Sequence, residues 1–188
     1  MLVHPALNVH AEPSQILIIG GGDGGSLREA LKYQTVQRVT VVEIDERVVQ
    51  ISKRFLPGLS QGFTDPRTEV IHQDGNDFVN APPTLYDVII VDSTDPVGPA
   101  ERLFSAQFYR AAFNALTPHG LLVTQSESLF FHHPFVAEVQ HHLGESFPIV
   151  DCYTQPLATY AGNWWSFSIG SKAHNPRWPR PIGSVRTR

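Results

Sequence analysis

The sequence predicts a doubly wound α/β fold, in which helices cover both faces of a mostly parallel sheet. Short apolar segments rich in β-branched residues alternate along the chain with helix-forming segments. The first apolar segment, residues 16–19, runs directly into six turn residues, 20–25, and then into a helical segment. Parallel strands joined by right-handed crossovers account for this order. We expect a seven-stranded sheet whose last two strands form an antiparallel pair.

Length and composition restrict the class of protein. The 188 residues suit one domain, and 41% of them are hydrophobic and 17% charged. The net charge of −4 does not indicate nucleic-acid binding, and no apolar run approaches the ~20 residues of a membrane span. The first residues lack the basic start of a signal peptide, and the single cysteine, Cys152, excludes an internal disulfide framework. We therefore expect a cytoplasmic protein with no membrane or nucleic-acid partner.

The first half of the chain contains clear start and stop signals. Residues 1–14 are a proline-containing lead-in segment, compatible with a short helix or an extended conformation. Glycines after the first strand permit a tight turn, and Pro57 with Gly58 stops a helix. In chain order we expect a strand at 16–19, a helix to about Tyr33, a strand at 39–45, a helix at 46–55, a loop at 60–67, a strand at 69–72 and a short helix at 76–80.

The second half continues the same alternation. A loop with two prolines and a glycine, residues 93–101, separates the apolar strand 86–92 from an amphipathic helix at 105–116. After these we expect a strand at 120–125, a helix at 134–143 and closing strands at 148–153 and 164–169. The residues from 173 to 188 are rich in proline and arginine and predict a disordered tail.

Acidic side chains follow nearly every predicted strand. Ligands of open α/β sheets bind beyond the carboxyl ends of the strands, so these side chains share one rim. An isolated acid at such a position is usually a helix cap, which is our interpretation of Asp45 and Asp77. The remaining polar residues of the rim are Asp23, Glu43, Asp74, Asp92, Asp95, Gln125 and Glu127. Their number favours one acidic pocket over separate caps.

The glycine loop and Glu43 indicate a nucleoside ligand. Gly20, Gly22 and Gly25 have the spacing of dinucleotide sites, and Glu43 lies about 20 residues further on, where an acid binds ribose hydroxyls. Asp23, however, occupies the place of the pyrophosphate, and a carboxylate ~4 Å from a phosphate charge costs about 4 kcal/mol at a dielectric near 20. The loop therefore disfavours NAD. It favours an adenosine with a positive group, such as a sulfonium compound of the S-adenosylmethionine kind.

Asp92 and Asp95 form the second informative pair. They lie on a proline-stiffened turn after the central strand and can face one small ligand from two sides. Paired acids often share a proton or bind a metal. The histidines lie in other segments, and we interpret the pairs His132-His133 and His141-His142 as helix-surface residues. We therefore expect no metal.

Five segments carry a family resemblance: ILIIGGGDGGSLREAL, VTVVEIDERVVQISKRFLP, DVIIVDSTDPVGPAERLF, TQSES and ATYAGNWWSF. They resemble the spermidine synthases, the polyamine aminopropyltransferases, over roughly residues 1–172. The resemblance implies a Rossmann-like, methyltransferase-type catalytic domain over 15–172 that binds a nucleoside and a polyamine. It implies decarboxylated S-adenosylmethionine as co-substrate, no prosthetic group, a diamine such as putrescine as acceptor, and a homodimer.

The resemblance also implies a role for each side chain of the rim. Around the co-substrate, Glu43 would hold the ribose hydroxyls, Asp74 and Gly75 the adenine edge, and Asp23 the aminopropyl ammonium. Around the acceptor, Asp92 would take a proton from the attacking amine and Asp95 would bind the diamine. Tyr160 would line the diamine channel, with Gln125 and Glu127 near its end.

Proton transfer makes a demand on Asp92. An alkylamine with a lysine-like pKa of about 10.4 is mostly protonated at pH ~7, and freeing its lone pair costs about 4.6 kcal/mol. A carboxylate with an ordinary pKa near ~3.9 is a poor base for this step. We therefore expect burial and the neighbouring Asp95 to raise the pKa of Asp92.

Two departures from the family pattern affect the expected activity. Family members carry a β-rich N-terminal domain before the equivalent of Met1, and it supplies a tyrosine and a glutamine to the active site. From this resemblance we expect a fragment or a truncated start, a site without one wall, and weak turnover by this chain alone. The family's PTYP motif is ATYA here, which keeps Tyr160 and leaves the choice of diamine open.

Three alternatives remain at this point. An amine N-methyltransferase that uses S-adenosylmethionine has the same scaffold and similar acidic loops. A non-catalytic module that binds nucleosides or polyamines is compatible with a missing wall. A NAD-dependent dehydrogenase is disfavoured by Asp23.

Overall fold

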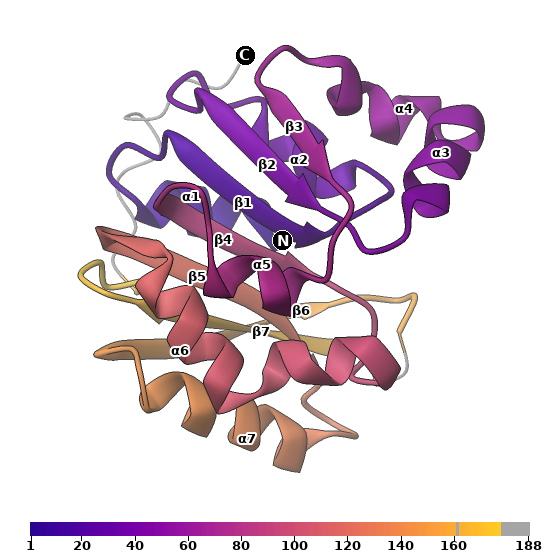
Figure 1. The fold of residues 1–188 in the computed structure, drawn as a ribbon. Coiled ribbons are helices and arrows are strands. Elements are labelled where there is room, and N and C mark those ends of the chain that lie inside the picture. Colours follow the sequence, from indigo (N-terminus) through magenta and orange to yellow (C-terminus); the bar gives the residue numbers. More distant parts are fainter. Residues whose placement is uncertain (161, 178–188) are drawn as a thin grey trace.

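The structure of the protein is a computed structural model that describes residues 1–160 and 162–177. Within these ranges, seven strands form one sheet in the order β3-β2-β1-β4-β5-β7-β6 (Figure 1). The strands β1 to β5 are parallel, and β7 runs antiparallel to both of its neighbours, β5 and β6. The strands are β1 Gln15–Gly20, β2 Arg38–Val42, β3 Thr68–Ile71, β4 Tyr86–Asp92, β5 Leu116–Ser128, β6 Ile149–Pro156 and β7 Trp164–Ser171. The predicted fold class is confirmed.

Helices cover both faces of this sheet. In Figure 1, α6 and α7 lie in front of the strands, and α1 and α2 lie behind them. The helices are α1 Val3–Val9, α2 Gly25–Ala30, α3 Glu46–Phe55, α4 Pro57–Ser60, α5 Gly75–Asn80, α6 Ala106–Asn114 and α7 His133–Gly144, with 3₁₀ turns η1 Gln61–Thr64 and η2 Gly98–Phe104. Among the helices of the described residues, none has the length and apolar character that a membrane crossing requires.

The core consists of two layers, because successive side chains of a strand point to opposite faces. Leu17 of β1 belongs to the cluster that contains Phe108 of α6. Ile16, one residue earlier, belongs to the cluster that contains Leu7 of α1 and Leu27 of α2. Strands buried on both faces are continuous apolar runs, which is why the sequence predicted them well.

The differences from the expected elements lie between the strands. The lead-in segment contains α1, and β2 ends at Val42, three residues before the predicted end. The predicted polar loop at 60–67 is wrong, because α4 and η1 occupy most of it and Phe63 packs into the core. The loop after β4 ends in η2. Residues 178–188 of the predicted tail lie outside the described residues.

Candidate active site

The glycine loop lies directly against the chain that leaves β4. Gly20 pairs in register with Asp92 and has φ of 80°, in the region that favours glycine. A Cβ atom on Gly20 would overlap the backbone carbonyl oxygen of Asp92. The backbone N–H of Gly21 donates to that same oxygen at 2.8 Å. The glycine loop therefore lies in direct contact with the end of β4.

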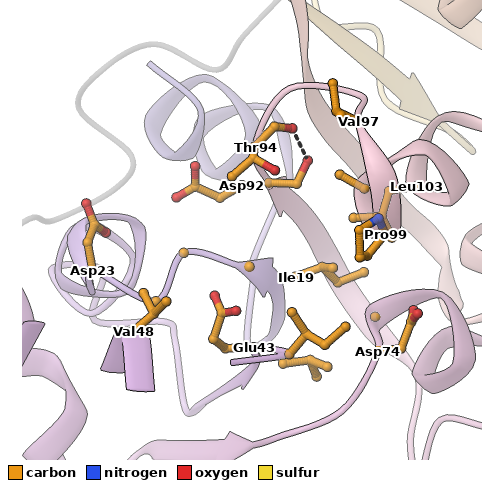
Figure 2. A pocket seen from close by; sticks show the side chains of 18 residues that line it. Ile19, Asp23, Glu43, Val48, Asp74, Asp92, Thr94, Val97, Pro99 and Leu103 are labelled. Atoms are coloured by element: carbon orange, nitrogen blue, oxygen red, sulfur yellow. Dashed lines mark hydrogen bonds between the residues drawn. The ribbon is translucent and has the colours of Figure 1, made fainter. Parts of the chain in front are cut away.

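Four of the predicted acids line a single cavity of about 390 Å³ at this rim. Figure 2 shows Asp23 and Asp74 toward opposite sides of the view, with Glu43 and Asp92 between them. Asp23 lies in the glycine loop, Glu43 and Asp74 follow β2 and β3, and Asp92 ends β4. The other lining residues are Ile19, Gly20, Gly21, Gly22, Val42, Ile44, Val48, Gly75, Ser93, Thr94, Val97, Pro99, Ala100 and Leu103. Carboxylates thus share the cavity with apolar walls, a composition that suits a cationic nucleoside.

Backbone amides hold three of these carboxylates from two residues further along the chain. One carboxylate oxygen accepts a single N–H in each case, which fixes the side chain while it still faces the cavity. The pairs are Asp23 with Gly25 at 2.8 Å, Glu43 with Asp45 at 3.1 Å, and Asp74 with Asn76 at 2.8 Å.

Arg102 was not found by the sequence reasoning. It lies on η2, and its guanidinium contacts Oδ2 of Asp74 at 3.1 Å and Oδ1 of Asp77 at 2.9 Å. The interpretation of Asp77 as a helix cap is wrong, because the side chain that accepts from the N-terminus of α5 is Asp74. Asp45 does cap α3, through the N–H of Arg47. Arg102 therefore connects η2 to α5 beside the cavity.

Asp92 is the last residue of β4 and is half-buried at the rim. Burial raises the pKa of its carboxyl above the ordinary range, and the charges of Asp23 and Glu43 raise it further. Ser26 opposes this shift, because its Oγ donates to Oδ2 of Asp92 at 2.6 Å. The expectation that burial raises the pKa of Asp92 is confirmed. The expected contribution of Asp95 is wrong, because its charge acts instead on Glu127.

A second cavity, of about 460 Å³, shares Asp92 with the first. Its other lining residues are Ser93, Thr94, Asp95, Val97, Gln125 and Tyr160. Gln125 donates from its side-chain amide to the carbonyl oxygen of Ser93. Tyr160 is 45% exposed and stacks on Trp165, with ring centroids 4.1 Å apart. A neighbouring cavity of about 350 Å³ also reaches Asp92, Gln125 and Tyr160.

Glu127 is placed differently from the other predicted residues. It does not appear among the described residues that line these three cavities. Burial and then the interaction with Asp95 raise the pKa of its carboxyl, while His132 lowers it. His132 is a contact that the sequence reasoning missed, since nothing in the local pattern joins it to Glu127.

The histidines do not assemble a metal site. Within residues 1–160 and 162–177, no group of three or more His, Cys, Asp or Glu side chains has an arrangement that could hold a metal ion. The interpretation of His142 as a helix-surface residue is wrong, because its side chain is 22% exposed and its Nδ1 donates to the carbonyl oxygen of Phe104 at 3.0 Å.

Comparison with a family model gives a match over residues 1–178, to the model described as "Spermine/spermidine synthase domain". Two similar relatives carry the name polyamine aminopropyltransferase. The one from Hydrogenobaculum sp. (strain Y04AAS1) is 49% identical over 177 residues, which cover 94% of this chain and 63% of the relative. The one from Aquifex aeolicus (strain VF5), polyamine aminopropyltransferase 1, is 47% identical over 187 residues, which cover 100% of this chain and 67% of the relative. The chain thus spans about two thirds of the relatives' length.

Solved structures of spermidine synthases are also similar to this chain. A spermidine synthase in complex with the transition-state analogue AdoDATO superposes with a TM-score of 0.90 at 35% identity, over 99% of this chain and 62% of that chain. The spermidine synthase from Thermotoga maritima superposes with a TM-score of 0.86 at 33% identity, over 99% and 60% of the two chains.

Proposed function

Because this chain belongs to the spermine/spermidine synthase family, we propose that it transfers an aminopropyl group from decarboxylated S-adenosylmethionine to putrescine. The products are spermidine and 5'-methylthioadenosine. The known names of the relatives support the transferase class, and the rim of the sheet supports the choice of reactants. The identity of the acceptor is the finer part of this proposal.

The position of Asp92 carries the proposal. Asp92 lines the cavity that contains Glu43 and also the cavity that contains Asp95 and Gln125. A nucleoside in the first cavity and an amine in the second would therefore meet at its carboxylate. A group that touches both reactants is what a transfer reaction requires.

The charge of the rim favours cationic reactants. Decarboxylated S-adenosylmethionine carries a sulfonium and an ammonium, and putrescine is a dication. Asp23, Glu43, Asp74 and Asp92 line the first cavity, and Arg102 neutralises only one of them in part. Two cations in a partly dry site need this compensating negative charge.

The chemical step balances with Asp92 as the base. The amine nitrogen of the acceptor loses a proton to the carboxylate of Asp92 and attacks the carbon attached to the sulfonium. The carbon–sulfur bond breaks, and the sulfur keeps its electron pair in neutral 5'-methylthioadenosine. Freeing an amine with a pKa of about 10.4 at pH ~7 costs about 4.6 kcal/mol. Burial raises the pKa of Asp92, which makes it a stronger base for this purpose.

The remaining side chains would bind and orient the reactants. Glu43 would accept the ribose hydroxyls, and Asp23 would face the aminopropyl ammonium. Asp74 and Gly75 would lie at the adenine edge, with Gly20, Gly22 and Gly25 allowing close approach of the loop. On the acceptor side the proposed residues are Asp95, Gln125, Glu127 and Tyr160.

Two measurements test the proposal. Titration calorimetry should show tighter binding of decarboxylated S-adenosylmethionine than of S-adenosylmethionine, whose extra carboxylate meets the acidic rim. Mass spectrometry of the product formed with putrescine should show the gain of one aminopropyl group. Gain of a methyl group from S-adenosylmethionine would identify an N-methyltransferase instead. Binding of both reactants without turnover would identify a binding module.

The acceptor and the assembly are tested separately. Putrescine, cadaverine and spermidine offered together as rivals should give mainly the product of putrescine. The homodimer implied by the family is tested by sedimentation of the 188-residue chain. A monomer that turns over both reactants would contradict the dimer and leave the reaction intact.

A further inference from the structure

The contact between Glu127 and His132 has no part in the chemistry described above. The side chain of Glu127 is 10% exposed, and its Oε2 lies 3.1 Å from Nδ1 of His132, whose side chain is 56% exposed. Neither residue appears among the described residues that line the three cavities around Asp92. Burial of an acid is unfavourable, so a buried carboxylate with a histidine donor indicates that this contact has a role.

The backbone at Glu127 has an unusual conformation. Glu127 has φ of 70°, in the left-handed region, which costs about 1–3 kcal/mol for a residue other than glycine. It lies where the pairing of β5 with β7 shifts register, between Gln125 and Ser128. The hydroxyl of Ser166 donates to the carbonyl oxygens of Ser126 at 3.0 Å and Glu127 at 2.8 Å and so holds the bend. Such conformations persist where the surrounding structure maintains them, and they cluster at functional sites.

The electrostatic neighbours of Glu127 come from two other segments. Asp95, on the loop after β4, raises the pKa of Glu127, and His132, just before α7, lowers it. Two adjacent carboxylates tend to share one proton unless a donor stabilises the second negative charge. Asp95 lines the 460 Å³ cavity proposed for the acceptor. A negative charge on Glu127 therefore adds to the attraction that this cavity offers to an amine.

We infer that His132 is a positioning residue that holds the Glu127 carboxylate in its anionic form beside Asp95 for the cationic acceptor. This inference rests on the proposed function, since it needs an amine in that cavity. His132 acts through Glu127, because its Nδ1–H donates to Oε2 and offsets both burial and the charge of Asp95. The exposed histidine ring is partly screened by solvent, so its effect is moderate.

Three variants separate this role from a structural one. His132→Phe keeps a ring and removes the donor, whereas His132→Asn places an amide nitrogen near the position of Nδ1. His133→Phe changes the next residue as a matched control. His132 precedes α7 without a side-chain hydrogen bond to that helix, so its replacement removes no cap.

The first readout is acceptor affinity, measured by titration calorimetry with putrescine and saturating 5'-methylthioadenosine. In His132→Phe the dissociation constant at pH 7 should rise about tenfold, equivalent to about 1.4 kcal/mol. It should return toward the wild-type value at pH 9, because a higher pH favours ionisation of Glu127 even without the donor. His132→Asn and His133→Phe should remain within about threefold of wild type at both pH values. An unchanged affinity in His132→Phe, or a loss of equal size at pH 7 and 9, would overturn the inference.

The second readout needs no ligand. Carbon-13 NMR of side-chain-labelled glutamate should show Glu127 titrating at higher pH in His132→Phe than in wild type, and unmoved in His133→Phe. If the wild-type protein binds putrescine and the titration of Glu127 does not move, the inference alone fails. If the titration moves and the wild-type protein binds no putrescine, the proposed function fails, and with it the role of His132 in acceptor binding.

Discussion

The two halves of the acidic rim hold their side chains in different ways. In the half formed after β1, β2 and β3, Asp23, Glu43 and Asp74 each accept a backbone N–H from two residues ahead. In the half formed after β4 and β5, side chains are the donors to Asp92 and Glu127. Asp92 accepts from Ser26, which lies 66 residues away.

This difference corresponds to a difference in chemistry. Asp23, which accepts from the backbone, is exposed at the rim, where a carboxylate can face a cation. Asp92 and Glu127 accept from side chains instead, and burial raises the pKa of both carboxyls. We therefore expect the first half to bind the co-substrate, and Asp92 in the second half to take up the proton.

The largest predicted effect comes from the second half. Asp92→Asn removes the proposed base and should lower the rate of the proposed aminopropyl transfer about 10²- to 10⁴-fold. Binding of decarboxylated S-adenosylmethionine should change little, because Glu43 and Asp74 remain. Chromatography of released 5'-methylthioadenosine gives the rate, and calorimetry gives the affinity. A variant with near wild-type turnover would remove Asp92 from the role of base.

The same variant should be more stable than wild type at neutral pH. Burial raises the pKa of Asp92 in the folded protein, so the folded state binds this proton more tightly than the unfolded chain. The resulting stabilisation is present at low pH and is lost as pH rises through the raised pKa. Urea unfolding should therefore favour Asp92→Asn at pH 7 and show no difference below pH ~3.9. A destabilised variant at pH 7 would contradict the account of burial.

The next effect tests the first half. A Cβ on Gly22 would lie 2.8 Å from Oε2 of Glu43 and 2.7 Å from Val48. Gly22→Ala must displace Glu43, and a strain of about 1–3 kcal/mol should weaken nucleoside binding about 5- to 100-fold. Gly58→Ala is the control, because nothing lies within 4 Å of its added Cβ. Equal affinities of the two variants for 5'-methylthioadenosine would show that the position of Glu43 does not matter.

A smaller effect should come from Ser26, the distant partner of Asp92. Ser26→Ala removes a hydrogen bond to a charged group, worth about 1.5 kcal/mol, and should lower the rate at neutral pH up to about tenfold, because a smaller fraction of Asp92 is then ionised. The pKa of Asp92 should rise further, so the acid limb of the pH–rate profile should move to higher pH. Ser93→Ala is the control. Ser93 lines the first cavity together with Asp92, but its hydroxyl donates to the carbonyl of Thr94 and not to Asp92. An unshifted profile in Ser26→Ala would argue against the coupling.

The smallest effect on the reaction should come from a purely local cap. Asp45→Ala removes the acceptor for the N–H of Arg47 and should cost about 1 kcal/mol of unfolding free energy. Turnover should stay at the wild-type value, because Asp45 does not appear among the described residues that line the cavities. Urea unfolding and the product assay measure the two quantities. A large loss of turnover would mean that the cap at Asp45 affects the cavities at the rim.

The sequence by itself determined the strands, the glycine loop and the rim acids. Apolar runs define buried parallel strands, and strand β4 and helix α3 begin and end at the predicted residues. Asp45 was identified as a cap because its partner is two residues away. Each of these features depends on residues within a few positions of one another, so local geometry is sufficient.

Only the tertiary structure decided which side chains meet. Three contacts join segments that are distant in sequence: the hydrogen bond from Ser26 to Asp92, the ion pair of Arg102 with Asp74 and the electrostatic interaction of Glu127 with Asp95. Sheet order and strand register bring these segments together, and neither is encoded in any short stretch of residues. The pKa of a carboxyl follows from burial and from such neighbours. For that reason the proton chemistry of the rim could be anticipated in kind, while its particular partners could not.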